Sequence, residues 1–149
     1  MRKLFTLVLL IAAAAGAFYV AQTGLLPGAS SDQAVLKAKS RRFLECLKFK
    51  NFAEAAQFHT AQDLKDTRHL PKLLEDFFLI PPENLDIQDI QIDFVEIDST
   101  GSRAKVKTTT KVNILNKKET QRPEIMLYWK KVGEEWYMDL RTTIERGRH

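Results

Sequence analysis

Cysteine is nearly absent from this chain of 149 residues, which contains only Cys46. A single cysteine cannot form an internal disulfide, so the sequence excludes a small scaffold stapled by disulfide bonds. Cys46 stands in an apolar stretch with helical character from Phe43 to Leu47, and neither a histidine nor a cationic residue adjoins it. The pattern predicts a buried, unreactive thiol rather than a nucleophile.

A strong excess of one charge is also missing. The net charge is +4, and Arg2 and Lys3 supply two of these charges, so the rest of the chain is near +2. This is far below the basicity of a nucleic-acid-binding domain, and we expect no nucleic-acid partner. The sequence also lacks internal repeats and low-complexity segments.

One long apolar run stands at the amino terminus, where Arg2 and Lys3 precede the uncharged residues Leu4 to Ala21. Residues 1–22 are therefore predicted to be a signal anchor or a signal peptide. Cleavage after Ala15-Gly16-Ala17 would release a secreted or periplasmic protein. The apolar extension past that point favours an uncleaved single-pass membrane helix, with the carboxyl-terminal domain outside the cytoplasm. No cysteine supports lipoprotein acylation there.

The remaining chain divides into a linker at 23–30, one domain at 31–144 and a solvated tail at 145–149. Leu36, Phe43 and Leu47 recur at helical spacing between lysines and arginines, which predicts a long helix with a basic outer face. A shorter helix is expected to begin at Asn51, and a third at Pro71.

The second half of the domain has the alternation of strands. Apolar residues alternate from Ile90, change phase at Val95 as at a bulge, and alternate again from Ala104 to Ile114. Further strands are expected at 125–129 and 136–144. Because one face is apolar and the other polar, we predict an α+β domain in which helices pack in a curved antiparallel sheet of about four strands. Trp129 and Trp136 are expected in its core.

Two segments carry a resemblance to a known family. The closing hairpin from Leu127 to Asp139, with Gly133 at its turn and Trp136 after it, resembles the nuclear transport factor 2-like superfamily, particularly its small exported members. Phe43-Leu44, followed by Lys50 to Ala55, resembles the opening helices of that family. The resemblance implies a cone-like fold that hosts isomerases, dehydratases, polyketide cyclases and non-catalytic modules. It also implies dimerisation through the outer face of the sheet.

Candidate catalytic groups are few. His59 with Asp63, and Asp66 with His69, have spacings at which a carboxylate could orient an imidazole as a general base on one helix face. Their positions at helix ends favour capping and solvation instead. An acidic run beside the first strand lacks the tight glycine loop that calcium needs and is expected to neutralise lysines across the sheet. We therefore predict a non-enzymatic protein with no metal site and no cofactor.

Two functional interpretations remain. The favoured one is an exported, membrane-tethered interaction domain that binds a protein partner or a second copy of itself through the outer sheet face. The alternative is a small-molecule-binding protein, or an enzyme of the isomerase or dehydratase kind, that uses the interior of the cone. The candidate partner-binding residues are Tyr128, Tyr137, Arg141, Lys105 and Lys107, and the candidate pocket residues are His59, Thr108 and Thr110, with Thr142 as a further inward hydroxyl.

Overall fold

The computed structural model describes residues 31–63 and 79–146. The predicted anchor and linker, the helix expected from Pro71, and the Asp66–His69 pair lie outside these ranges. None of the helices within them is long and apolar enough to cross a membrane. The chain order is α2 (Ser31–Lys48), α3 (Phe52–Ala56), η2 (Pro82–Asn84), β1 (Leu85–Ile97), β2 (Arg103–Ile114), β3 (Glu119–Gln121), β4 (Glu124–Val132), β5 (Glu135–Met138) and α5 (Leu140–Arg146).

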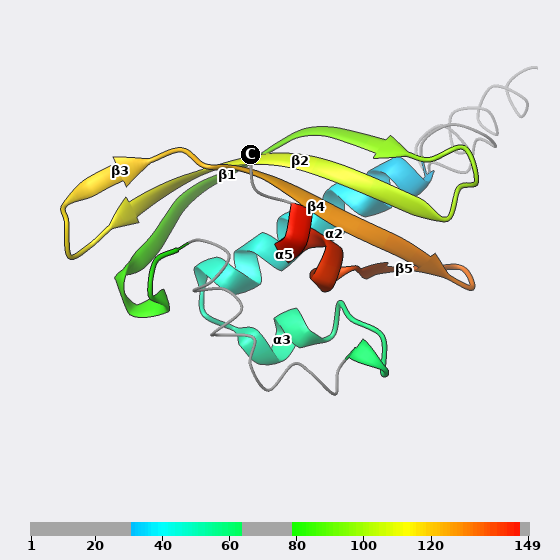
Figure 1. Ribbon diagram of the computed structural model, residues 1–149, viewed down its shortest axis with the longest axis horizontal. Helices are drawn as coiled ribbons and strands as arrows, with labels where there is room; N and C mark the ends of the chain where they lie inside the picture. Colours follow the sequence, from blue (N-terminus) through cyan, green and yellow to red (C-terminus); the bar gives the residue numbers. More distant parts are fainter. Residues whose placement is uncertain (1–30, 64–78, 147–149) are drawn as a thin grey trace, which may run out of the picture. The chain divides into compact units, whose positions relative to one another are not determined.

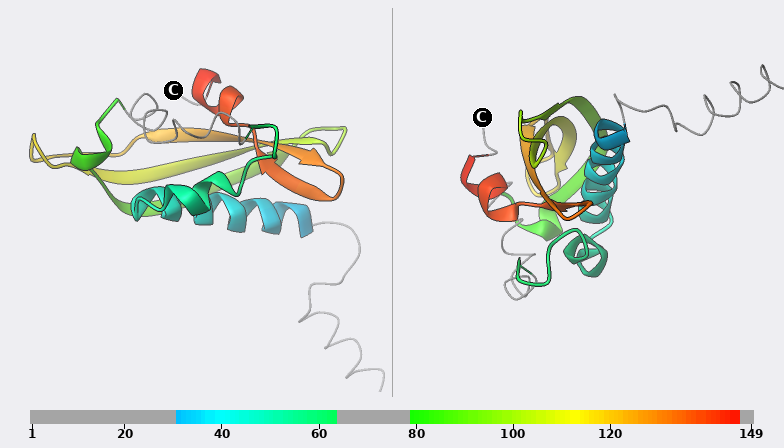
Figure 2. Two further views of the ribbon diagram at one scale, coloured as in Figure 1. Left: turned by 90° about the horizontal axis from the view of Figure 1, so that it is seen from below. Right: turned by 90° about the vertical axis from the view of Figure 1, so that its right-hand side faces the viewer.

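The strands form one antiparallel sheet in the order β1-β2-β4-β5, and the short β3 pairs with the end of β2. The sheet curls, α2 packs on one side of it, and α5 lies on the other side in both views of Figure 2 (Figures 1 and 2). The predicted α+β class and the curved antiparallel sheet are therefore confirmed for this part of the chain.

The phase change expected in the first strand is a real irregularity of β1. The pairing with β2 shifts between Ile92 and Phe94, and a second shift lies between Ile87 and Asp89. An extra residue in one strand reverses the side on which the following side chains point. Ile92 and Val95 therefore both pack against the core, although their spacing is odd.

The core lies between α2 and the inner face of the sheet. The even-numbered residues of β2 are buried from Ala104 to Ile114, as the alternation predicts. Trp129 and Trp136 are each 1% exposed, which confirms their expected place. Cys46 is also buried, and burial raises the pKa of its thiol. The buried side chains that α2 contributes are Leu36, Ser40, Phe43, Leu44, Cys46 and Leu47.

Basic side chains of α2 do more than face solvent. The Lys39 ammonium donates to the carbonyl oxygen of Trp136 in β5 at 2.9 Å. Arg41 donates to the carbonyl of Ile90 and Lys48 to that of Gln88, both in β1 and both at 3.0 Å. Because β1 and β5 are the outermost strands of the main sheet, α2 is linked to both of its edges.

The last predicted strand, 136–144, is wrong in its second half. β5 ends at Met138, and the helix α5 begins at Leu140. Asp139 stops the strand because its carboxylate accepts hydrogen bonds from the backbone N–H and the hydroxyl of Thr142, at 3.2 and 2.8 Å. These are the bonds of a helix amino-terminal cap. The predicted tail is also shorter than expected, since Glu145 and Arg146 belong to α5.

Candidate functional site

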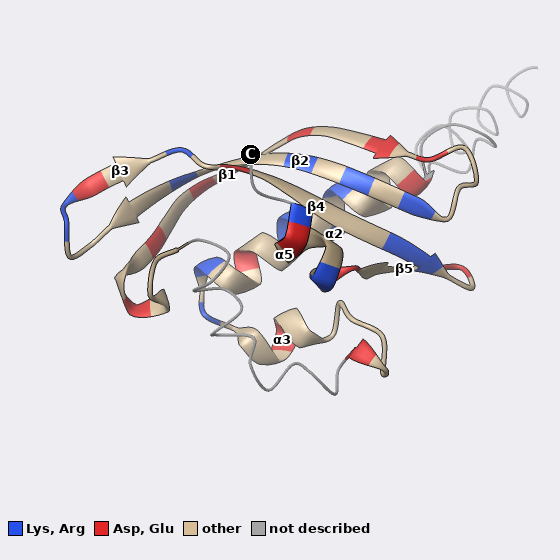
Figure 3. Ribbon diagram, in the orientation of Figure 1, with Lys and Arg blue, Asp and Glu red and all other residues tan. Residues whose placement is uncertain are grey.

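The outer face of the sheet collects four of the five candidate partner-binding residues. The register places Tyr128 opposite Lys105, Met126 opposite Lys107 and Tyr137 opposite Lys130. Directly paired residues in an antiparallel sheet point to the same side. Lys105, Lys107, Tyr128 and Tyr137 therefore share one half-exposed surface, and Figure 3 shows the basic positions along β2 and at the end of β4.

Carboxylates lie among these lysines. Lys105 forms an ion pair of 3.1 Å with Glu96 of β1, and Lys107 forms one of 2.8 Å with Glu124 of β4. The hydrogen bond and the negative charge of Glu124 raise the pKa of Lys107. The expected neutralisation by the acidic run of β1 is confirmed for Lys105, whereas Lys107 takes its partner from the other neighbouring strand.

An apolar side chain completes this surface. Phe94 of β1 pairs with Lys107 and is 42% exposed, although large apolar side chains in a sheet are usually covered. In the sequence, Phe94 continues the alternation of Ile90 and Ile92, and this alternation predicts a buried ring. The register shift after Ile92 turns it outward instead.

Arg141 does not lie on a strand as the sequence predicted. It belongs to α5, where its side chain is 88% exposed and binds Glu145 at 3.0 Å. The same helix is fastened to the edge of β4, because the backbone N–H of Tyr128 donates to the hydroxyl of Thr143 at 2.9 Å. The N–H of Asp139 also donates to the carbonyl of Tyr128 at 2.8 Å. Arg141 therefore lies on α5, next to the outer face of the sheet and not on one of its strands.

His59 and Asp63 do not share a helix face, because α3 already ends at Ala56. His59 is 3% exposed, and its Nδ1 lies 3.2 Å from the carbonyl oxygen of Ala56. A carbonyl only accepts, so Nδ1 carries the proton and Nε2 of the neutral ring keeps a lone pair. Nε2 has no hydrogen-bond partner in the described part of the chain. Burial lowers the pKa of His59.

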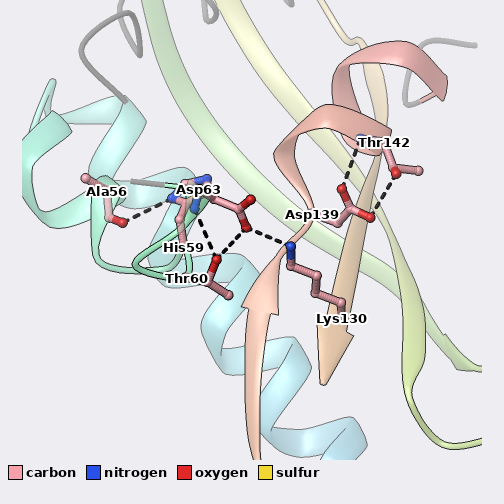
Figure 4. A network of polar contacts seen from close by, with 7 residues as sticks. All are labelled: Ala56, His59, Thr60, Asp63, Lys130, Asp139 and Thr142. Carbon is pink, nitrogen blue, oxygen red and sulfur yellow. Dashed lines mark hydrogen bonds and ion pairs between the residues drawn. The ribbon is translucent and has the colours of Figure 1, made fainter. Parts of the chain in front are cut away.

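The groups that donate hydrogen bonds to the Asp63 carboxylate are not the imidazole of His59. Its Oδ2 accepts from Lys130 at 2.7 Å and from the hydroxyl of Thr60 at 2.8 Å (Figure 4). Burial alone would raise the pKa of Asp63, but the hydrogen bonds from Lys130 and Thr60, together with the positive charge of Lys130 and the electrostatic effect of His59, hold the pKa below its ordinary value. The arrangement fastens the segment after α3 to β4. It does not make Asp63 the orienting partner of His59.

The two threonines expected inside the cone are indeed buried, each 0% exposed. Thr108 donates to the carbonyl of Ile125 at 3.1 Å, so its hydroxyl is satisfied by the backbone. The hydroxyl of Thr110 has no hydrogen-bond partner among the residues that the structure describes. Thr142 is not an inward group, since it lies on α5 and binds Asp139.

Sequence reasoning missed further buried polar groups. Within residues 31–63 and 79–146, the buried side-chain atoms without a hydrogen-bond partner are Ser40 Oγ, His59 Nε2, Thr110 Oγ1, Trp129 Nε1 and Trp136 Nε1. Ser40 could have been recognised, because it interrupts the apolar stripe of its helix. The two indole N–H groups give no such signal, since tryptophan is expected in a core in any case.

The described residues contain no group of three or more His, Cys, Asp or Glu side chains that could hold a metal ion. No known family profile matches the sequence, and no curated protein is similar enough to be a relative. The resemblance to the nuclear transport factor 2-like superfamily thus stays a prediction.

Proposed function

We propose that this protein is a non-catalytic interaction domain, tethered to a membrane by residues 1–22, whose outer sheet face binds a second copy of the chain. The observation that carries the proposal is the cross-strand register. It gathers Tyr128, Tyr137 and the exposed ring of Phe94 on one surface with Lys105 and Lys107.

The aromatic residues and Met126 of this face are of the types that are enriched at protein interfaces. Its charges favour a second copy over a uniformly acidic partner. Glu96 and Glu124 are 60% and 52% exposed beside Lys105 and Lys107, so both signs occur on the same surface. A two-fold arrangement can then place the lysines of one protomer against the carboxylates of the other.

Charge reversal tests the proposal. Full-length protein with Lys105→Glu and Lys107→Glu should be monomeric in analytical ultracentrifugation under conditions where the wild type is a dimer. A matched control with Lys117→Glu and Lys118→Glu changes two exposed lysines of the β2–β3 turn by the same charge. The control should remain dimeric.

A second experiment separates self-association from binding of another protein. A variant with Glu96→Lys and Glu124→Lys should form a mixed dimer with the double lysine-to-glutamate variant, because opposite faces then meet. A monomeric wild type at every concentration would reject the self-association. If the Lys117/Lys118 control were monomeric and the Lys105/Lys107 variant remained dimeric, the dimer interface would not be the outer sheet face.

A second candidate function is the binding of a small polar molecule inside the curled sheet. Ser40, His59 and Thr110 have buried polar atoms without a hydrogen-bond partner in the described part of the chain. They favour this function, because such an atom costs roughly 1–3 kcal/mol that a bound molecule would recover. Native mass spectrometry of the full chain tests it. A reproducible adduct that is lost in Thr110→Val would support an interior ligand.

A further inference from the structure

A pocket of about 210 Å³ lies beside the outer edge of β5, between this strand, α2 and the segment from α3 to Phe58. Two consecutive residues of β5, Trp136 and Tyr137, belong to its lining. The full lining consists of Lys39, Glu54, Gln57, Phe58, Trp136 and Tyr137.

The walls of this pocket are held by contacts between the three elements. Lys39 binds the Trp136 carbonyl, and the N–H of Met138 donates to the carbonyl of Phe58 at 2.8 Å. Glu54 is fixed by Arg42, whose Nη2 lies 2.6 Å from its Oε1. The pocket is thus formed before any ligand arrives, which reduces the ordering cost of binding.

Opposite charges stand on different walls of the pocket. Lys39 of α2 is 28% exposed and uses two of its three N–H donors, on Glu135 Oε2 at 3.0 Å and on the Trp136 carbonyl. Its remaining donor can take a carboxylate. Glu54 is 31% exposed, and its Oε2 accepts a hydrogen bond from Asn51 at 2.8 Å. A carboxylate oxygen can accept a further hydrogen bond from an ammonium group.

The rest of the lining is aromatic. Phe58 and Tyr137 are half-buried aromatic residues of the lining, and the Lys39 ammonium lies 6.0 Å from the centre of the Tyr137 ring. The Trp136 side chain is almost fully buried, and its indole N–H has no acceptor among the described residues. A cavity of roughly 150 Å³ holds a benzene ring in another protein, so this volume suits a ring with a small polar group attached.

We infer that this pocket binds a zwitterionic amino acid with a ring-sized apolar side chain. Its carboxylate would bind Lys39, its ammonium group would bind Glu54, and its side chain would pack on the aromatic walls. This site shares Tyr137 with the proposed outer-face interface, but its charged residues Lys39 and Glu54 do not belong to that face. The inference does not depend on dimerisation.

Calorimetric titration of the full-length protein with three probes tests this inference. L-Phenylalanine carries both charges, phenethylamine lacks the carboxylate, and 3-phenylpropionate lacks the ammonium group. L-Phenylalanine should bind about tenfold or more tightly than either analogue, because each lost charge removes one charge-assisted hydrogen bond. Equal affinities for the three probes would overturn the zwitterion assignment, and no binding up to about 10 mM would overturn the site.

Variants assign each charge to its residue. Lys39→Gln should weaken L-phenylalanine about tenfold and leave phenethylamine unchanged, whereas Lys37→Gln, an exposed lysine outside the lining, should change neither. Glu54→Gln should weaken L-phenylalanine and leave 3-phenylpropionate unchanged. Glu54 also binds Arg42 and Asn51, so circular dichroism must show that the Glu54→Gln variant is folded. If this variant does not fold, the affinities measured with Lys39→Gln decide the test. An unchanged affinity in Lys39→Gln would reject the proposed orientation.

Discussion

His59 is a buried imidazole whose two ring nitrogens have different surroundings. Nδ1 faces a backbone carbonyl, whereas Nε2 has no hydrogen-bond partner among the described residues. The ring centre of Phe43 lies 6.1 Å from that of the imidazole. Protonation would place a charge in this environment, close to the Asp63–Lys130 pair. The surroundings therefore keep the ring neutral at physiological pH.

This neutrality makes the stability of the fold depend on pH. The unfolded chain binds a proton at His59 near its ordinary pKa of 6.5, whereas the folded chain binds it only at lower pH. The free energy of unfolding should therefore decrease as the pH falls below about 6.5 and be fully retained above that value. Urea unfolding between about pH 7.5 and 5 measures the slope.

The control for this prediction removes the other two histidines. A variant with His69→Gln and His149→Gln leaves His59 as the sole imidazole and should keep the slope, while a further His59→Gln change should abolish it between those pH values. A slope that persists without any histidine would show that carboxylates cause it.

At the same scale, sequence spacing placed some site residues well and others poorly. Thr108 and Thr110 were predicted on the inner face because strand alternation depends only on neighbouring residues. His59 and Asp63 were paired through an assumed helix that the chain does not continue, since Asn51 caps a helix that ends after five residues. Spacing alone does not show where a short helix stops.

Among the elements, α5 shows how a short cap overrides alternation. Trp136, Met138 and Leu140 alternate as in a strand, but Leu140 and Ile144 are also spaced as on one face of a helix. Both patterns fit the apolar residues equally well. Asp139 decides between them, because its carboxylate binds the backbone N–H and hydroxyl of Thr142 and starts the helix.

Removal of this cap should loosen α5. Asp139→Ala is expected to lower the free energy of unfolding by about 0.5–2 kcal/mol, the usual effect of a lost amino-terminal cap. The amide of Tyr128 should also exchange with solvent faster, because it donates to Thr143 of the same helix. Hydrogen exchange followed by NMR measures both effects. Glu134→Ala, an exposed acidic residue in the preceding turn, should change neither.

At the scale of the whole molecule, α2 protects backbone groups on the two outermost strands of the sheet. An outermost strand presents unpaired backbone groups that can recruit another chain. Arg41 and Lys48 occupy carbonyls of β1, and Lys39 occupies one of β5. The same helix thus covers the inner face of the sheet and blocks parts of both edges.

Loss of the β1 contacts should increase edge-to-edge association. A variant with Arg41→Met and Lys48→Met keeps long aliphatic stems but frees the carbonyls of Ile90 and Gln88. We expect it to aggregate faster on mild heating, measured by light scattering, and to lose about 1 kcal/mol of stability for each hydrogen bond. Lys37→Met, on the same helix, serves as the control. Equal aggregation rates in both variants would show that edge protection by α2 is unimportant.

The general architecture could be predicted from the sequence because amphipathic periodicity is a local property. The long helix, the alternating β2 and the turn at Gly133 all follow from neighbouring residues. The ion pair between Asp63 and Lys130, the pocket at β5 and the edge contacts of α2 could not be predicted. Each joins residues distant in the sequence, and only the curvature of the sheet brings them together.

Because α2 is bonded to both β1 and β5, its contacts with the two strands can form only in sequence as the chain is synthesised. Its contact with β1 joins residues 49 apart in the chain, and its contact with β5 joins residues 97 apart. A ribosome makes the chain from its amino terminus, so α2 is synthesised long before either partner strand. The contacts of α2 with the sheet therefore stay incomplete until β5 has been made, and the described domain can complete its fold only after Trp136 is available.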